Sequence, residues 1–76
     1  MTFYKNHPIY GFGLPARGKR WRSIGLVFDP DYPAKEVKRL ECADVISATS
    51  EEAEAYALKL CKAWIDGLGL PPTQTN

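Results

Sequence analysis

The clearest pattern in the chain is a run of apolar residues at steps of three and four near its C-terminus. The positions that share this helical face are Ala53, Tyr56, Ala57, Leu60 and Trp64. Thr49 and Glu52 have the spacing of a capping box, and Gly67 is typical of a left-handed helix stop. The pattern therefore predicts one amphipathic helix over residues 50–66, with the large side chains of its apolar face buried.

Three segments upstream of this helix alternate apolar and polar residues, which is the spacing of β-strands. They span residues 8–14, 20–28 and 36–43. In the first segment Gly11 and Gly13 weaken the strand pattern and are consistent with a β-bulge. The third segment also has the composition of a helix, because Glu, Lys, Arg and Leu favour helices. We interpret it as a strand with a polar outer face, and keep the helix as the alternative.

The connections between these segments carry turn signals. Residues 15–19 contain Gly18, whose freedom to take a positive φ suits a hairpin turn. Residues 29–34 include Pro30 and Pro33, which cannot donate to a strand ladder, so a loop is expected there. The sequence thus predicts an α+β fold, a three-stranded antiparallel sheet packed on one C-terminal helix (β-β-β-α). It forms a single domain over residues 1–70, followed by a disordered tail over residues 71–76.

The second strand has two unlike faces, and the sequence does not decide which one the helix covers. Ile24, Leu26 and Phe28 lie on one face, whereas Trp21, Ser23, Gly25 and Val27 lie on the other. If Trp21 faces away from the helix, the free face of the sheet is partly basic. If Trp21 instead faces the helix, the free face is aliphatic and aromatic.

Composition narrows the class of protein. Of the 76 residues, 45% are apolar and 25% charged, which is typical of a globular chain. No apolar stretch is long enough to span a bilayer, and the first residues lack the apolar centre of a secretory signal, so we expect a cytoplasmic protein with reduced cysteines. The formal net charge is only +1, with the strand half mildly basic and the helix half mildly acidic.

Three motifs resemble those of a group of small, uncharacterised bacterial proteins with a β-β-β-α layout. They are Tyr-Lys-x-x-x-Ile at residues 4–9, Gly-x-x-Trp at residues 18–21, and Thr-x-Glu-Glu-Ala at residues 49–53 with a Trp-Ile-Asp tail at residues 64–66. A looser likeness, through Gly-Lys-x-Trp and Thr-x-Glu-Glu-Ala-x-x-Tyr, is to the AP2/ERF-type and integrase-arm DNA-binding domains. That resemblance implies a free sheet face that presents Arg and Trp to the DNA major groove, and the matching positions are Arg20, Trp21 and Arg22.

The candidate binding residues lie around the first hairpin turn. They are Arg17, Lys19, Arg20, Trp21 and Arg22. Closely spaced cations suit phosphate contacts, and an aromatic ring can stack on a base. The structural alternative is a basic turn that only keeps the hairpin soluble.

Reactive chemistry has less support in the sequence. His7, Cys42 and Cys61 are potential soft ligands, but their spacing matches no zinc motif, and neither cysteine lies where its pKa would be lowered. Cys42 and Cys61 are therefore interpreted as packing residues, with a disulfide as the less favoured alternative. We expect no catalytic residues, no metal site and no cofactor.

Aromatic residues exceed what one helix can cover on a three-stranded sheet. An uncovered sheet face that carries aromatic residues is typical of a protein interface. The sequence therefore favours a non-enzymatic binding module that uses the sheet face opposite the helix for protein interaction or self-association. Nucleic-acid binding through the basic hairpin around Trp21 is the alternative.

Overall fold

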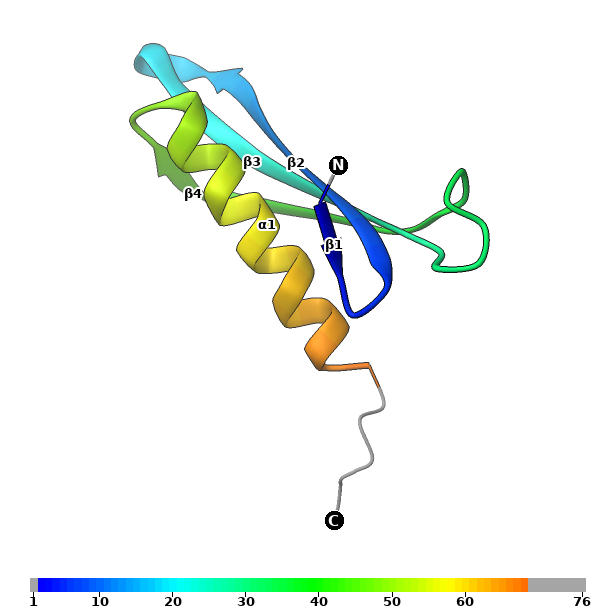
Figure 1. Ribbon diagram of the computed structural model, residues 1–76. Coiled ribbons are helices and arrows are strands. Elements are labelled where there is room, and N and C mark those ends of the chain that lie inside the picture. The colour runs from blue at the N-terminus through cyan, green and yellow to red at the C-terminus, as the bar shows by residue number, and fades with distance from the viewer. Residues whose placement is uncertain (1, 69–76) are drawn as a thin grey trace.

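The computed structural model describes residues 2–68, except for the side chains of residues 43–45. Four antiparallel strands form one sheet in the order of the sequence, and one helix follows them (Figure 1). The elements are β1 (Thr2–Tyr4), β2 (His7–Ala16), β3 (Arg20–Phe28), β4 (Glu36–Ser47) and α1 (Ser50–Asp66). The α+β class and the C-terminal helix are confirmed. The tail expected over residues 71–76 lies outside the described residues.

The predicted count of three strands was wrong, because β1 forms a fourth. This strand has only three residues, too few to show an alternating pattern. Lys5 and Asn6, with φ of 48° and 72°, form a tight turn. Two successive positive φ angles are what a type I′ hairpin turn requires. Tyr4 consequently pairs with His7, and β1 lies along the first part of β2.

The β2–β3 hairpin keeps one register throughout, so the bulge expected at the glycines of β2 is absent from this pairing. Pairing runs without a shift from Ile9 opposite Val27 to Ala16 opposite Arg20. Gly11 has a different role: because it lacks a side chain, the backbone of α1 can pack closely against β2 at this position. A Cβ atom built on Gly11 would stand 2.6 Å from the backbone oxygen of Glu54.

Helix α1 begins as the sequence predicts. The Thr49 hydroxyl accepts a hydrogen bond from the Glu52 N–H at 3.1 Å, and the Glu52 carboxylate accepts one from the Ala48 N–H at 3.2 Å. Its end differs from the prediction. Gly67 has a right-handed conformation, with φ of −83°, and its N–H donates to the carbonyls of Ala63 and Trp64.

The buried face of α1 is rotated from the predicted one. The buried residues are Ala53, Ala57, Cys61 and Ile65, at steps of four, whereas Tyr56, Leu60 and Trp64 are only half-buried. The reason is that the sheet residues directly beneath the middle of the helix are small: Gly11, Gly13, Ser23 and Gly25. The helix therefore turns its small side chains down to the sheet and its large ones to its flanks.

Strand β4 confirms the strand interpretation of residues 36–43 and extends it to Ser47. Between Cys42, opposite Ser23, and Ile46, opposite Arg22, the register shifts, so β4 carries an irregularity there. The loop before β4 is also as predicted. The Asp29 carboxylate accepts hydrogen bonds from the N–H groups of Asp31 and Tyr32, at 2.7 and 3.1 Å.

Candidate functional site

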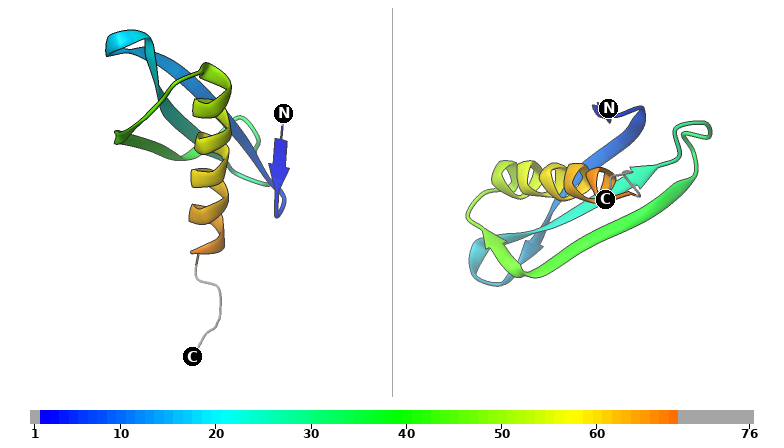
Figure 2. Two further views of the ribbon diagram at one scale, coloured as in Figure 1. Left: turned by 90° about the vertical axis from the view of Figure 1, so that its left-hand side faces the viewer. Right: turned by 90° about the horizontal axis from the view of Figure 1, so that it is seen from below.

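The helix covers one side of the sheet, and Figure 2 shows α1 on that side only. Strand β3 turns Ser23 and Val27 toward the helix. Both are buried, and the Ser23 hydroxyl donates to the Ala53 carbonyl at 2.7 Å. Because side chains alternate along a strand, Ile24, Leu26 and Phe28 point to the opposite side. The structure thus decides the question left open by the sequence in favour of an aliphatic and aromatic free face.

Strand β2 contributes large side chains to the same side. Phe12 lies opposite Ile24, and Tyr10 lies opposite Leu26, so each pair shares a face of the sheet. We call this surface the open face; its members on the three longest strands are Tyr10, Phe12, Leu14, Ala16, Arg20, Arg22, Ile24, Leu26, Phe28, Glu36, Arg39, Glu41 and Ile46.

Apolar exposure on the open face is greatest along β2. Phe12 is 42% exposed and Tyr10 38%, whereas Ile24 in the adjacent strand is 9% exposed. The Tyr10 ring stacks on Phe12 with 5.7 Å between centroids and meets Phe28 edge-on at 6.0 Å. These rings form a fixed aromatic cluster at the surface, where no described helix covers them.

The charged residues of the open face lie in ion pairs within the described part of the chain, except Arg20 at the hairpin tip. Arg22 lies 3.8 Å from Glu41 across the β3–β4 ladder. Arg39 lies 3.5 Å from Glu36 along β4. The face therefore combines an apolar half, on β2 and β3, with a locally neutral charged border on β4.

The basic hairpin predicted from the sequence comprises Arg17, Lys19, Arg20, Trp21 and Arg22. Its cations are all exposed, and they lie in and beside the single 3₁₀ turn that joins β2 to β3. Trp21 does not share a surface with its neighbours, because strand alternation places it on the other side of the sheet from Arg20 and Arg22. The structure thus brings the cations together at one tip but separates the tryptophan from them.

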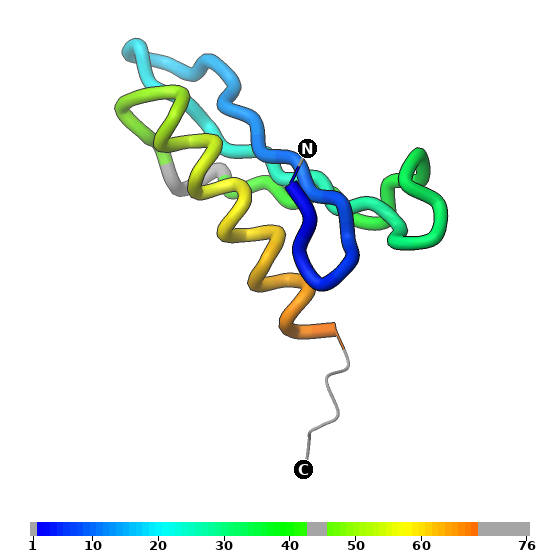
Figure 3. Tube along the Cα trace, in the orientation of Figure 1, coloured from blue at the N-terminus to red at the C-terminus, as the bar shows by residue number. Residues whose placement is uncertain are grey.

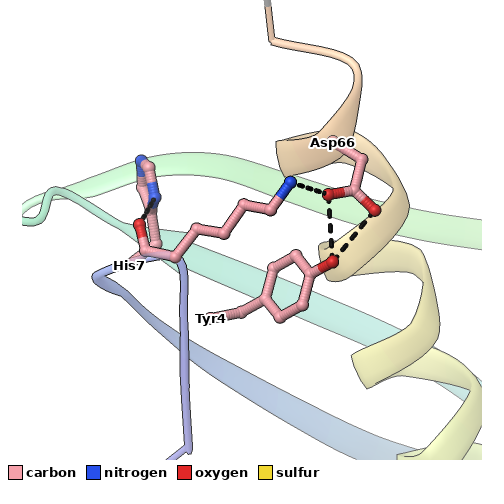
Figure 4. A network of polar contacts seen from close by, with 4 residues as sticks. Tyr4, His7 and Asp66 are labelled. Carbon is pink, nitrogen blue, oxygen red and sulfur yellow. Dashed lines mark hydrogen bonds and ion pairs between the residues drawn. The ribbon is translucent and has the colours of Figure 1, made fainter. Parts of the chain in front are cut away.

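A polar cluster that the sequence does not reveal joins the two ends of the fold. The Tyr4 hydroxyl donates to the Asp66 carboxylate, with its oxygen 3.0 Å from both carboxylate oxygens, and Lys5 Nζ lies 2.7 Å from Asp66 Oδ1 (Figure 4). Figure 3 shows the β1–β2 turn beside the C-terminal end of α1. The contact therefore fastens the first hairpin to the end of the helix.

This cluster has electrostatic consequences. Hydrogen bonds from Lys5 and then from Tyr4 lower the pKa of the Asp66 carboxyl. The hydrogen bond to Asp66 raises the pKa of the Tyr4 hydroxyl and also that of the Lys5 amine. All three groups are held in the protonation states they have at neutral pH, which suits an anchor rather than a proton-transfer site.

The potential soft ligands are dispersed. His7 Nδ1 lies 3.2 Å from the Lys5 carbonyl oxygen, whereas Cys61 is buried at the centre of the helix–sheet interface. Burial raises the pKa of the Cys61 thiol, and its sulfur lies 3.6 Å from the Leu26 carbonyl oxygen. Both cysteines are free thiols. Within residues 2–68 we find no group of three His, Cys, Asp or Glu side chains placed to hold a metal, and no pocket.

Comparisons with models of known protein families, with curated proteins and with solved structures found no match to this chain. The resemblances drawn from its motifs therefore stay predictions. In the described part of the chain, no helix has the length and apolar character needed to cross a bilayer.

Proposed function

We propose that this protein is a non-enzymatic binding module that self-associates through its open face. The observation that supports the proposal is the distribution of side-chain size across the sheet. Gly11, Ser23 and Gly25 lie under the middle of the helix, and Ile9 and Val27 are the large apolar side chains of the two strands that are fully buried on that side. The large apolar side chains of β2 and β3 on the open face outnumber them: Tyr10, Phe12, Leu14, Ile24, Leu26 and Phe28. Of these two strands, the side with more large apolar side chains is thus the side that no helix within residues 2–68 covers.

Burial of this face by a partner is energetically favourable. Full burial of one large apolar side chain contributes about 1.5–3 kcal/mol. In a chain of 76 residues the internal core is small, so these side chains represent a large share of the available hydrophobic stabilisation. Two such sheets pack face to face about 10 Å apart, which would enclose Phe12, Leu26 and their neighbours.

Charge complementarity supports a second copy as the occupant. A two-fold interface places the same patch on both partners, so an unpaired charge on the patch would meet its like or be buried without a partner. On the open face, Arg22 is paired with Glu41 and Arg39 with Glu36. Apart from Arg20, which lies at the hairpin tip of the same side, the face is therefore neutral at its border and apolar at its centre, a combination compatible with its own copy.

Sedimentation velocity over a range of concentrations tests this proposal. The wild-type protein is expected to form dimers, and Phe12→Glu is expected to shift it to monomer, since it places a charge at the centre of the apolar half. Tyr32→Glu is the matched control, because Tyr32 is 69% exposed in the β3–β4 loop, away from the face. A wild-type protein that stays monomeric at the highest concentration would contradict the proposal.

The basic hairpin supports a second candidate function, contact with nucleic acid. Arg17, Lys19 and Arg20 are exposed at one tip, and none forms an ion pair with another described residue. If this tip binds phosphates, affinity for duplex DNA falls steeply with salt, and Arg17→Ala with Arg20→Ala lowers the slope by roughly one unit for each lost contact. Binding that is independent of salt, or unchanged in the double variant, would exclude the hairpin as the site.

A further inference from the structure

The outer edge of β2 is only partly paired. β1 pairs with His7, Pro8 and Ile9 and with no later residue of β2. Residues 10–16 have β3 on their inner side. On their outer side no strand within residues 2–68 pairs with them. Because alternate residues of an antiparallel strand direct their N–H and C=O groups to the same side, this stretch presents unpaired backbone groups outward.

The two edges of the sheet differ in charge. β4, which forms the opposite edge, carries Glu36, Lys38, Arg39 and Glu41. Charged residues of this kind protect an edge strand against pairing with another chain. Residues 10–16 of β2 contain no charged residue at all. Its one protective residue is Pro15, which lies next to the hairpin turn. The less protected edge is therefore the outer edge of β2, and we use this name for residues 10–16 on that side.

The surroundings of this edge differ above and below the sheet. On the open face, Tyr10, Phe12 and Leu14 would meet the side chains of an added strand. On the helix side the flank of α1 lies over β2, since a Cβ on Gly11 would stand 3.0 Å from Leu58 Cγ. Glu54 and Glu51 precede Leu58 at steps of four and three, so they lie along the same flank.

The acidic residues of that flank are available to a partner. Glu51 and Glu54 are both exposed, and neither forms an ion pair with a described residue. An extended segment added to the edge would direct alternate side chains to the apolar face and to this acidic flank. Basic residues suit the second set and apolar residues the first.

From these observations we propose that the outer edge of β2 binds an extended segment of a partner protein as a fifth strand, with basic and apolar residues alternating along that segment. Backbone hydrogen bonds to the edge give affinity, and the alternating side chains give selectivity, as in other cases of strand addition. A second copy of the chain fits this edge poorly, because it would bring two sets of Glu51 and Glu54 together. The site borders the self-association surface along Tyr10, Phe12 and Leu14, but it differs from that surface in using the backbone of the edge and the acidic flank of α1.

The test is a titration of ¹⁵N-labelled protein with a short, end-blocked peptide of alternating Val and Lys, followed by NMR. Saturable shifts are expected at the backbone amides of residues 10–14 and 16, since Pro15 has no N–H. A control peptide in which Glu replaces every Lys is called the Val-Glu peptide. It is expected to bind about tenfold more weakly than the Val-Lys peptide, because attraction at the acidic flank becomes repulsion. A Val-Lys peptide with N-methyl groups along one strand edge should bind still less, since it loses the backbone hydrogen bonds on that side.

Glu54→Lys is the decisive variant. It is expected to reverse the order of the two peptides, whereas Lys59→Glu, on the solvent side of the helix, keeps the wild-type order. Glu54→Lys is expected to leave the sedimentation of the protein unchanged. A negative result in the peptide titration is therefore distinguishable from a negative result for self-association. The proposal would be overturned by any of four results: no shifts, equal affinity for both peptides, shifts confined to β4, or the same order of peptide affinities in Glu54→Lys as in the wild type. Concentration-dependent shifts at residues 10–16 that occur without peptide and persist in Phe12→Glu, in which the open-face dimer is lost, would also overturn it, because they would identify a second copy as the occupant of the edge.

Discussion

Gly25 of β3 lies directly beneath Cys61 of α1, so close that a Cβ on Gly25 would stand 2.6 Å from Cys61 Sγ. The same Cβ would lie 2.8 Å from the backbone oxygen of Ala57, an atom that cannot move without the helix. The distance between helix and sheet is thus determined by the absence of a side chain at this position.

Gly25→Ala is expected to destabilise the fold, although alanine normally suits a strand better than glycine. Overpacking against a helix backbone costs about 1–3 kcal/mol, which outweighs the gain of about 0.5–1 kcal/mol from reduced chain entropy. Urea denaturation measures the change. Gly67→Ala is the matched control, because a Cβ there has ordinary contacts at 3.5 Å, and it should be nearly neutral. A Gly25→Ala protein as stable as the wild type would contradict this view of the interface.

Ser23→Ala tests the one polar side chain found buried in the described core. Its hydroxyl donates to the Ala53 carbonyl at 2.7 Å, and Ser23 is 1% exposed. Loss of this bond is expected to cost about 1 kcal/mol in the free energy of unfolding. Ser47→Ala on β4 removes a hydroxyl that makes no hydrogen bond to a described side chain, and should cost less. Equal effects of the two variants would show that the Ser23 bond contributes little.

Stability should depend on pH through the cluster of Tyr4, Lys5 and Asp66. The pKa of Asp66 is lowered in the folded state, so its contribution is present above its unfolded value, near 3.8, and is lost as the pH falls through the folded value. The pKa values of Tyr4 and Lys5 are raised, so their contribution is present below pH 10 and is lost as the pH rises further.

Asp66→Asn is the variant that tests this dependence. Urea midpoints measured at neutral and acidic pH should fall less on acidification in Asp66→Asn than in the wild type. Asp31→Asn, in the β3–β4 loop, serves as the control and should keep the wild-type dependence. An acid response in Asp66→Asn as large as that of the wild type would exclude the cluster as its source.

The parts of the fold that sequence predicts well are those with local signals. The helix start follows from Thr49 and Glu52, and the two central strands follow from alternating residues and from the turn at Gly18. Both features depend on residues close together in the chain. They are consequently visible without knowledge of the tertiary structure.

The parts that sequence missed depend on contacts between distant residues. The buried face of α1 is set by Gly11 and Gly25, which as isolated residues read only as weak points of a strand. Both faces of β3 carry apolar residues, so periodicity alone does not orient it. The Tyr4–Asp66 contact joins residues 62 positions apart, and no local pattern signals it. The sequence therefore predicted an uncovered sheet face, but only the position of the helix in the structure shows which residues lie on it.

In the proposed dimer, two copies pack through their open faces. The most direct measurement is an isotope-filtered NOE experiment on an equal mixture of ¹³C-labelled and unlabelled protein, at concentrations where sedimentation shows dimer. We expect intermolecular NOEs among Tyr10, Phe12, Leu26 and Phe28, and their loss in Phe12→Glu. Intermolecular NOEs that arise instead from α1 or from β4, or a protein without intermolecular NOEs at any concentration, would contradict it.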